Sequence, residues 1–305
     1  MKERERRVLK LGISALVMVF AAGHALAAGV YCIEKDPLLY GYLNQHDIGG
    51  AVAPVACGPA SAVNSLVYLQ NRYPSIHDQK LIPDTNGNNQ IDYAEMVAVG
   101  QTLANANHMN TQAPGGTFTD NFLYGKQLWM ETQAAGLTVY EAQSPWGWTH
   151  DPATTVPAPS WIQDTYPTWD FLYDELVDCE DVEILIEWEK APGEWTGHYL
   201  TLTSFCWTDD CDDIIEPGEA TIGFVDCDPG GPAPLTAFHV PNAPLWQRTD
   251  GILATSYREG YDNSPAIITF ASSQSPIPEP VTVLGLFLGL SALFSYVRSR
   301  HAARD

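Results

Sequence analysis

The chain of 305 residues has few basic side chains away from its two ends. Residues 28–271 contain 33 acidic but only 7 basic side chains, which gives this body a formal charge near −26. So acidic a surface disfavours nucleic acids and anionic membranes as partners. We therefore expect no nucleic-acid partner, and contact with a membrane only through the terminal segments.

The sequence also lacks an internal repeat of fold-defining length. Residues 28–271 have the length of one ordinary domain with a sizeable core. We expect this domain to lie between a signal peptide (1–27) and a C-terminal tail (272–305).

The N-terminus has the order of a secretory signal peptide. A basic head is followed by an apolar run, Leu11–Ala22, and then by Ala25-Leu26-Ala27, a small-x-small cleavage pattern. The apolar run is too short to favour a membrane-spanning helix. An uncleaved anchor is the alternative, and with either arrangement the body leaves the cytoplasm. The basic residues of the head are Lys2, Arg4, Arg6, Arg7 and Lys10.

The C-terminus carries a second set of signals. Ser272 to Pro280 is polar and proline-rich, which is typical of a linker. Val281 to Val297 then forms a 17-residue run without charge, near the lower limit for spanning a bilayer. Three arginines close the chain and favour a cytoplasmic end; they are Arg298, Arg300 and Arg304.

Pro278-Glu279-Pro280, the apolar run and the arginine cluster, in this order, resemble the PEP-CTERM sorting tail of exopolysaccharide-producing Gram-negative bacteria. In that family an exosortase recognises and cuts the tail. The resemblance implies export to the cell envelope or extracellular matrix, with transient anchoring in the inner membrane by the C-terminal helix. A plain C-terminal anchor is the alternative.

Six cysteines are compatible with an oxidising compartment, where disulfides form. If Cys57 is a working thiol, five remain, and at least one of those is unpaired. Three cysteines lie close in sequence (Cys206, Cys211 and Cys227), which favours a bridge among them, but sequence alone leaves the connectivity open. The other two are Cys32 and Cys179.

Apolar periodicity predicts an α+β fold with helices first and antiparallel strands after. We expect this sheet to pack against the helical half that carries Cys57. A long surface loop is expected over Ser144 to Pro167. The expected helices are 60–70, 93–106, 122–135 and 169–176, and the expected strands are 182–188, 198–205, 220–226, 252–257 and 266–271.

Cys57 is the sharpest local signal for chemistry. In Cys57-Gly58-Pro59, the proline fits the first turn of a helix, where a missing N–H is no loss. This places the thiol at a helix N-terminus, where free N–H groups and the helix dipole stabilise a thiolate. A thiolate is a nucleophile. A small buried cysteine that begins a helix is the alternative interpretation.

His198 is the best candidate for a base. It follows Cys57 by 141 residues and opens a predicted strand after Gly197. Papain-type enzymes place histidine about 130–150 residues after the cysteine, and such a histidine can accept the thiol proton. A hydrogen-bonded histidine at a strand edge is the alternative, and His46 is the fallback base.

An acid is needed to orient the imidazole. Asp226 and Asp228 end the next strand and share its parity, so either could serve; the alternative for one of them is an ordinary turn-opening residue. Gln45 lies 12 residues before Cys57, and its amide could join the Cys57 N–H in an oxyanion hole, unless it is a surface glutamine.

Gln45, then Cys57-Gly58-Pro59, then Gly197-His198-Tyr199, then an Asp-Pro resemble the papain-like peptidases related to bacteriocin leader-processing enzymes. The resemblance covers about Tyr40 to Gly231. It implies a papain-like fold, Cys57 as nucleophile, His198 as general base and acid, and Gln45 as oxyanion donor. The acid of this family precedes a proline, which favours Asp228 over Asp226. The chain departs from the family in a long tryptophan-rich insertion and in having no transporter domain after it.

Asp84 to Glu95 resembles an EF-hand loop, with an apolar Ile91 at position 8 and Asn89 in place of the usual glycine at position 6. The pattern predicts a structural Ca²⁺ site; the alternative is an Asn/Gly turn whose last acids cap a helix. The candidate ligands are Asp84, Asn86, Asn88, Gln90, Asp92 and Glu95.

Thr208 to Glu219 is a weaker match to the EF-hand pattern, and a solvated acidic loop accounts for it equally well. Its candidate ligands are Asp210, Asp212, Glu216 and Glu219.

These patterns together predict an exported, calcium-stabilised cysteine peptidase that acts on a peptide or protein substrate. Two rivals remain open: a catalytically silent binding protein of the same fold at the cell surface or in the matrix, and an acyl transferase.

Overall fold

The computed structural model describes residues 29–78, 80–146, 148, 158–178, 180–209, 214–229 and 235–277. The expected signal peptide, the C-terminal apolar run and the arginine cluster lie outside these residues, as do Cys179, Cys211, Asp210 and Asp212. Within the described part of the chain, no helix has both the length and the apolar character needed to cross a bilayer.

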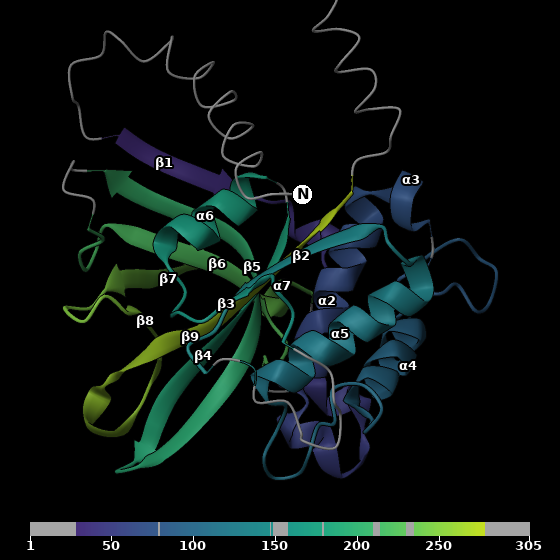
Figure 1. Ribbon diagram of the computed structural model, residues 1–305, viewed down its shortest axis with the longest axis horizontal. Coiled ribbons are helices and arrows are strands. Elements are labelled where there is room, and N and C mark those ends of the chain that lie inside the picture. The colour runs from purple at the N-terminus through teal and green to yellow at the C-terminus, as the bar shows by residue number, and fades with distance from the viewer. Residues whose placement is uncertain are drawn as a thin grey trace, which may run out of the picture.

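The fold is mixed α+β, with one large, mostly antiparallel sheet and a few helices (Figure 1). The longer helices are α2 (Cys57–Arg72), α4 (Tyr93–Ala104), α5 (Thr119–Ala134) and α6 (Trp169–Val177). Short helical segments are η1 (Pro37–Leu39), η2 (Gln45–Ile48), η3 (Gly50–Val55), α3 (Pro74–His77), α7 (Leu235–Phe238) and η4 (Tyr261–Asn263). The strands are β1 (Gly29–Glu34), β2 (Thr138–Gln143), β3 (Ile162–Gln163), β4 (Asp181–Ala191), β5 (Glu194–Asp209), β6 (Ala220–Asp226), β7 (His239–Gln247), β8 (Leu253–Glu259) and β9 (Pro265–Pro276).

The expected order of helices before strands holds for the longer elements, since α2, α4 and α5 precede β4 to β9. Three strands of the sheet were not expected from the sequence: β1, β2 and β7. Another small strand, β3, lies within the stretch predicted as an irregular loop and pairs in parallel with β2.

Six strands form a closed ring of antiparallel pairings, because β4 pairs with both β5 and β9, and β5 connects to β9 through β6, β7 and β8. One hydrophobic core fills the space between these strands and α6, with Ile186, Leu200 and Phe224 among its fully buried members. A second core lies between the sheet and the helices α2, α4 and α5, which Figure 1 shows gathered beside the sheet.

A buried polar cluster joins the helices to the sheet. The Lys126 ammonium of α5 lies 2.8 Å from Ser65 Oγ of α2 and 2.8 Å from Asp181 Oδ2 of β4. It also donates to Glu183 and to the side-chain oxygen of Gln274. All five side chains are nearly or fully buried, so each is paired as a buried charge or polar group must be.

The segment predicted to begin a linker at Ser272 is instead strand, because β9 continues to Pro276. Ser272 and Ser273 are buried and donate to Glu183 and Glu175, and the Gln274 N–H donates to Asp181. These buried and half-buried carboxylates need hydrogen-bond donors, and the polar residues of β9 supply them. The folded body therefore extends past residue 271.

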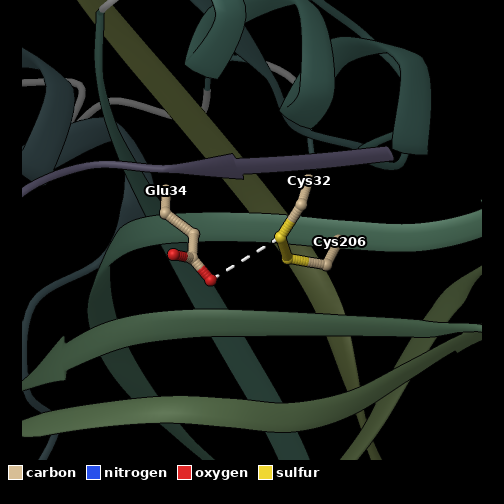
Figure 2. A group of neighbouring side chains, drawn as sticks. All are labelled: Cys32, Glu34 and Cys206. Carbon is tan, nitrogen blue, oxygen red and sulfur yellow. Dashed lines mark hydrogen bonds between the residues drawn. A yellow bond between two sulfur atoms is a disulfide. The ribbon is translucent and has the colours of Figure 1, made fainter. Parts of the chain in front are cut away.

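A disulfide joins Cys32 on β1 to Cys206 on β5, which face each other in the antiparallel register. In Figure 2 the Glu34 side chain reaches towards this bridge, with Oε1 lying 3.6 Å from the Cys32 sulfur. The bridge proposed among Cys206, Cys211 and Cys227 is thus wrong for Cys206, and Cys227 is a free thiol. Only tertiary pairing brings the N-terminal strand beside β5, across 174 residues of sequence.

Candidate active site

Cys57 is the first residue of α2 and is almost buried, with 8% of its surface exposed. Close packing fixes the start of the helix: a Cβ at Gly58 would lie 2.9 Å from the Thr117 side chain. Glycine is therefore required for the loop that carries Thr117 to approach the helix N-terminus. As expected from the sequence, the thiol stands where helix N–H groups are free.

His198 of β5 lies against Cys57. Burial raises the pKa of the Cys57 thiol, but the hydrogen bond and charge of His198 and the backbone N–H groups of Tyr199 and Gly58 together outweigh it. The pKa of Cys57 is consequently lowered below its ordinary value. Such a thiol is present as the nucleophilic thiolate at a lower pH than a free cysteine.

Asp226, the last residue of β6, holds the other side of the imidazole: its Oδ1 lies 2.6 Å from His198 Nε2. Burial lowers the pKa of His198, but the hydrogen bonds to Asp226 and Cys57 and their charges raise it to about 10. Conversely, burial raises the pKa of Asp226, and His198, together with the Tyr257 hydroxyl and the Asp228 backbone N–H, more than reverses this. The three side chains thus form a chain of contacts, Cys57–His198–Asp226, in which each member favours the charged form of its neighbour.

The preference for Asp228 as the orienting acid is wrong in this structure. Asp228 Oδ1 lies 3.3 Å from Nε2 of the exposed His46, so the acid favoured by the resemblance and the fallback histidine pair with each other. The Asp228 backbone N–H donates to Asp226 Oδ1 at 2.7 Å. The physical reason is the strand end: Asp226 is still in register with Leu200 of β5, whereas Asp228 has left the sheet.

Two residues on β8 complete the surroundings of Asp226 and were not expected from the sequence. The Tyr257 hydroxyl donates to Asp226 Oδ2, and Nη2 of Arg258 lies 3.5 Å from the same oxygen. Asp226 therefore accepts on both oxygens. A tyrosine and an arginine on a strand carry no signal of this role, because strand pairing alone brings β8 close to the end of β6.

Gln45 begins η2 and is buried, 4% exposed, in the wall of the same cleft as Cys57. Its Nε2 donates to the Pro54 carbonyl at 3.4 Å, and its backbone N–H donates to the Cys227 carbonyl at 2.9 Å. A primary amide has two N–H groups, so the bond to Pro54 leaves a second donor on Nε2. The structure thus brings together Gln45, Cys57 and His198 as the sequence predicts.

Cys227 is a second free thiol beside the site, and its position was not expected. It is fully buried, and its Sγ donates to the Cys57 carbonyl at 3.5 Å. Burial raises the pKa of Cys227 well above the ordinary value, and the charge of Cys57 adds to this. The contrast separates the two thiols: Cys57 is activated and Cys227 is held protonated.

A cleft of about 790 Å³ opens over the thiol and is large enough for several residues of a peptide. It lies between the loop around Gly116, the start of α5 and the hairpin of β4 and β5. Its lining includes Gln45, Cys57, Gly116, Glu187, Trp195 and His198.

The loop from Asp84 to Glu95 has some features of an EF-hand loop. Asp84 accepts hydrogen bonds from three backbone N–H groups, those of Gly87, Asn88 and Asn89, and Asn89 has φ 60°. Asparagine at position 6 therefore adopts the left-handed conformation that the pattern requires. The side-chain amides of Asn86 and Asn88 both donate to Asp92, so positions 3, 5 and 9 converge.

Glu95, at position 12 of this loop, also caps a helix. Its Oε1 accepts from the Thr85 N–H at 2.6 Å and its Oε2 from the Asp92 N–H at 3.2 Å, which makes a capping box at the start of α4. The helix cap weighed as the alternative is thus present, and calcium binding stays a prediction. The side-chain oxygens of the loop are of the hard type that Ca²⁺ prefers.

In the weaker acidic loop, Glu219 accepts from the Glu216 N–H at 2.7 Å, as in a simple turn. The other two candidate ligands there lie outside the described residues. Within the described chain, two groups of three metal-type side chains converge: Cys32, Glu34 and Cys206, whose cysteines are disulfide-bonded, and His198, Asp226 and Cys227 of the candidate site.

No family model matches this chain, and no curated protein matches it. The chemistry of the site therefore rests on its geometry. An activated thiol, a base oriented by a carboxylate and free N–H donors at a helix N-terminus, in a cleft of peptide size, are the parts required for nucleophilic acyl chemistry.

Proposed function

We propose that this protein is an exported cysteine peptidase of the papain-like type. The observation that carries the proposal is the chain of contacts from Cys57 to His198 to Asp226, at the edge of a cleft wide enough for a peptide. Asp226 is 2% exposed, and burying a carboxylate is costly unless it is paired. Here the pairing orients the imidazole of His198, as a catalytic base requires.

The Cys57 thiolate attacks the carbonyl carbon of the scissile peptide bond. The negative charge that develops on the carbonyl oxygen is stabilised by the Cys57 N–H and the free N–H of the Gln45 amide. His198 then gives its proton to the departing amine, which leaves a thioester on Cys57. Water deprotonated by His198 attacks the thioester, and the thiolate returns.

The sequence of proton transfers explains why Asp226 matters. His198 carries a proton in the resting ion pair, loses it to the amine and regains it from water. Asp226 holds Nε2 throughout, so the nitrogen that faces Cys57 stays aligned for both transfers. Tyr257 keeps the carboxylate in place by donating to its other oxygen.

The test uses the mature body and an epoxide-type cysteine-protease probe, with the labelled residue located by mass spectrometry. We expect label on Cys57 and not on Cys227, because the pKa of Cys57 is lowered and that of Cys227 is raised. Cys57→Ala should abolish hydrolysis while the circular dichroism spectrum stays unchanged. Failure of Cys57 to react would favour the binding-protein alternative, and transfer of the acyl group to an added amine would favour an acyl transferase.

We also propose that Ca²⁺ binds the loop from Asp84 to Glu95 and stabilises the fold. The observations in support are the backbone geometry at Asp84 and Asn89 and the convergence of three polar side chains on one point. The proposed role of the ion is structural, and it takes no part in the chemical steps.

Delivery remains a proposal that rests on the two ends of the chain. The N-terminal signal would export the protein, and an exosortase would act on the PEP-CTERM-like tail. The disulfide between Cys32 and Cys206 supports an oxidising destination, since such bonds persist outside the cytoplasm.

A further inference from the structure

Glu187 of β4 lines the candidate active-site cleft but takes no part in the catalytic chain. In the register of β4 and β5 it faces Gly197, the residue directly before His198. A Cβ at Gly197 would lie 3.2 Å from Glu187 Cγ and 2.9 Å from Leu185 Cδ1. The glutamate side chain thus lies over a glycine that leaves room beside the catalytic base.

The Glu187 carboxylate has no basic partner in the described part of the chain: none of the ion pairs there involves it. It is half-buried, and burial raises its pKa more than the neighbouring Thr269 hydroxyl lowers it. A carboxylate that has lost part of its hydration without gaining a cation is unfavourable. A cation brought by a ligand would supply the missing partner.

Trp195 provides an aromatic surface on the same face of the hairpin as this carboxylate. It lies two residues before Gly197, so it is on the same face of the hairpin, and it lines the same cleft. Its indole is 54% exposed, although the chain buries most of its large apolar side chains. An exposed indole on the same face as a carboxylate suits a guanidinium or ammonium group, which gains from both.

The opposite wall adds negative charge. Asp120, in the first turn of α5, also lines the cleft. Burial raises the pKa of Tyr199 most, and the charges of Cys57, Glu187 and Asp120 raise it further. Both carboxylates therefore act on the same point, the tyrosine that follows His198.

Two basic residues, Arg258 and Lys190, also line the cleft, and neither forms an ion pair with Glu187 within the described chain. Arg258 lies 3.5 Å from Asp226 Oδ2 and over the ring of Trp188. Lys190 is exposed near the end of β4.

We propose that the cleft binds substrates through a cationic side chain, arginine or lysine, close to the bond that Cys57 attacks, with the Glu187 carboxylate as its partner and Trp195 as its stacking surface. This inference rests on the proposed function and specifies its substrate class. The acidic body supports it, because a strongly negative protein attracts cationic peptides over long range.

The test uses matched peptidyl epoxides that carry either arginine or its neutral isostere citrulline, at each of the two positions nearest the electrophile. We expect Cys57 to react about tenfold faster with the arginine probe at one of these positions, the lower end for a charged hydrogen bond because Glu187 is only half-buried. Glu187→Gln should remove this preference. Glu194→Gln, an exposed change of equal charge on the same hairpin, should retain it.

Iodoacetamide, which is too small to reach the subsite, separates the two levels of the argument. Its rate at Cys57 should be the same in the wild type and in Glu187→Gln, which also shows that the variant is folded. Equal rates for arginine and citrulline in the wild type at both positions, or a preference that survives Glu187→Gln, would overturn the inference and leave the proposed function standing. No reaction of Cys57 with any reagent would overturn both.

Discussion

Replacing Asp226 by asparagine tests the chain of contacts from which the chemistry is argued. The substitution keeps the size of the side chain and removes its charge, 2.6 Å from the imidazole of His198. The imidazolium is then less stable, so the pKa of His198 falls from about 10. Since His198 is the partner that lowers the pKa of Cys57, the pKa of the thiol must rise.

The magnitude follows from burial and neighbours. An adjacent opposite charge shifts a pKa by about 1–3 units, and each unit corresponds to about 1.4 kcal/mol. Asp226 is buried, which favours the upper part of this range, but Arg258 lies 3.5 Å from its second oxygen and offsets part of the charge. We expect the midpoint of Cys57 alkylation against pH to move up by about 1–2 units.

Asp228→Asn is the matched control. Asp228 pairs with His46, whose side chain is 48% exposed, so its charge is screened by solvent. Its contact with the site is a backbone N–H to Asp226 Oδ1, which the substitution leaves intact. The alkylation midpoint should therefore stay within a few tenths of a unit of the wild type. The assay is the rate of iodoacetamide labelling at Cys57 between pH 4 and 9, followed by mass spectrometry.

Two results would refute this reasoning. If Asp228→Asn moves the midpoint as far as Asp226→Asn, Asp228 also acts on His198 in solution. The pairing of β5 and β6 at this end would then differ from the register described above. If neither moves it, His198 does not govern the ionisation of Cys57.

Two further predictions concern stability and delivery. The melting temperature of the mature body should be higher in Ca²⁺ than in chelator, with an affinity for Ca²⁺ of about 0.1–1 mM. Glu95→Gln should weaken this stabilisation, whereas Glu219→Gln should not. Equal melting temperatures in Ca²⁺ and in chelator would exclude calcium at the loop from Asp84 to Glu95. In a host with an exosortase, intact-mass analysis should show a chain that begins near Ala28 and ends near Pro280, and a mass that includes Arg298 to Asp305 would contradict the sorting proposal.

The helix that carries Cys57 and the strand that carries His198 could both be predicted, because each has a local signal. Gly58 and Pro59 predict the start of a helix, and the alternation of apolar and polar residues after His198 predicts a strand. Their meeting could be argued because a base and a thiol at that separation suit one chemistry. None of these steps required knowledge of the sheet order.

The sequence could not decide which aspartate orients His198, and the reason is geometric. Asp226 and Asp228 have the same parity, so both satisfy the pattern. The choice depends on where β6 ends against β5, and the register places Asp226 opposite Leu200 as the last paired residue. The same limit hid Tyr257 and Arg258, because they reach Asp226 from a strand that is remote in sequence.

Two further elements were not predicted because each forms only through pairing with strands that are distant in sequence. β7 contains Pro241 and Pro244, which weaken the local signal for a strand, and yet it pairs with β6 and β8 in the ring. The polar end of β9 reads as a linker because serine and glutamine are common in linkers. It becomes strand because buried acids on β4 need its donors, and this requirement is invisible until the two strands are paired.

The buried cluster around Lys126 helps to fix how α2, which carries Cys57, lies against the sheet. A buried ion pair adds little net stability, since the cost of dehydrating its charges offsets their attraction. It does penalise any arrangement in which one partner is left alone, at about 3–5 kcal/mol. Ser65 of α2 and Asp181 of β4 both contact the Lys126 ammonium, so a slip of α2 along the sheet would break these contacts. Since Cys57 lies on α2 and His198 on the neighbour of β4, the register that satisfies the cluster is also the register that brings thiol and imidazole together.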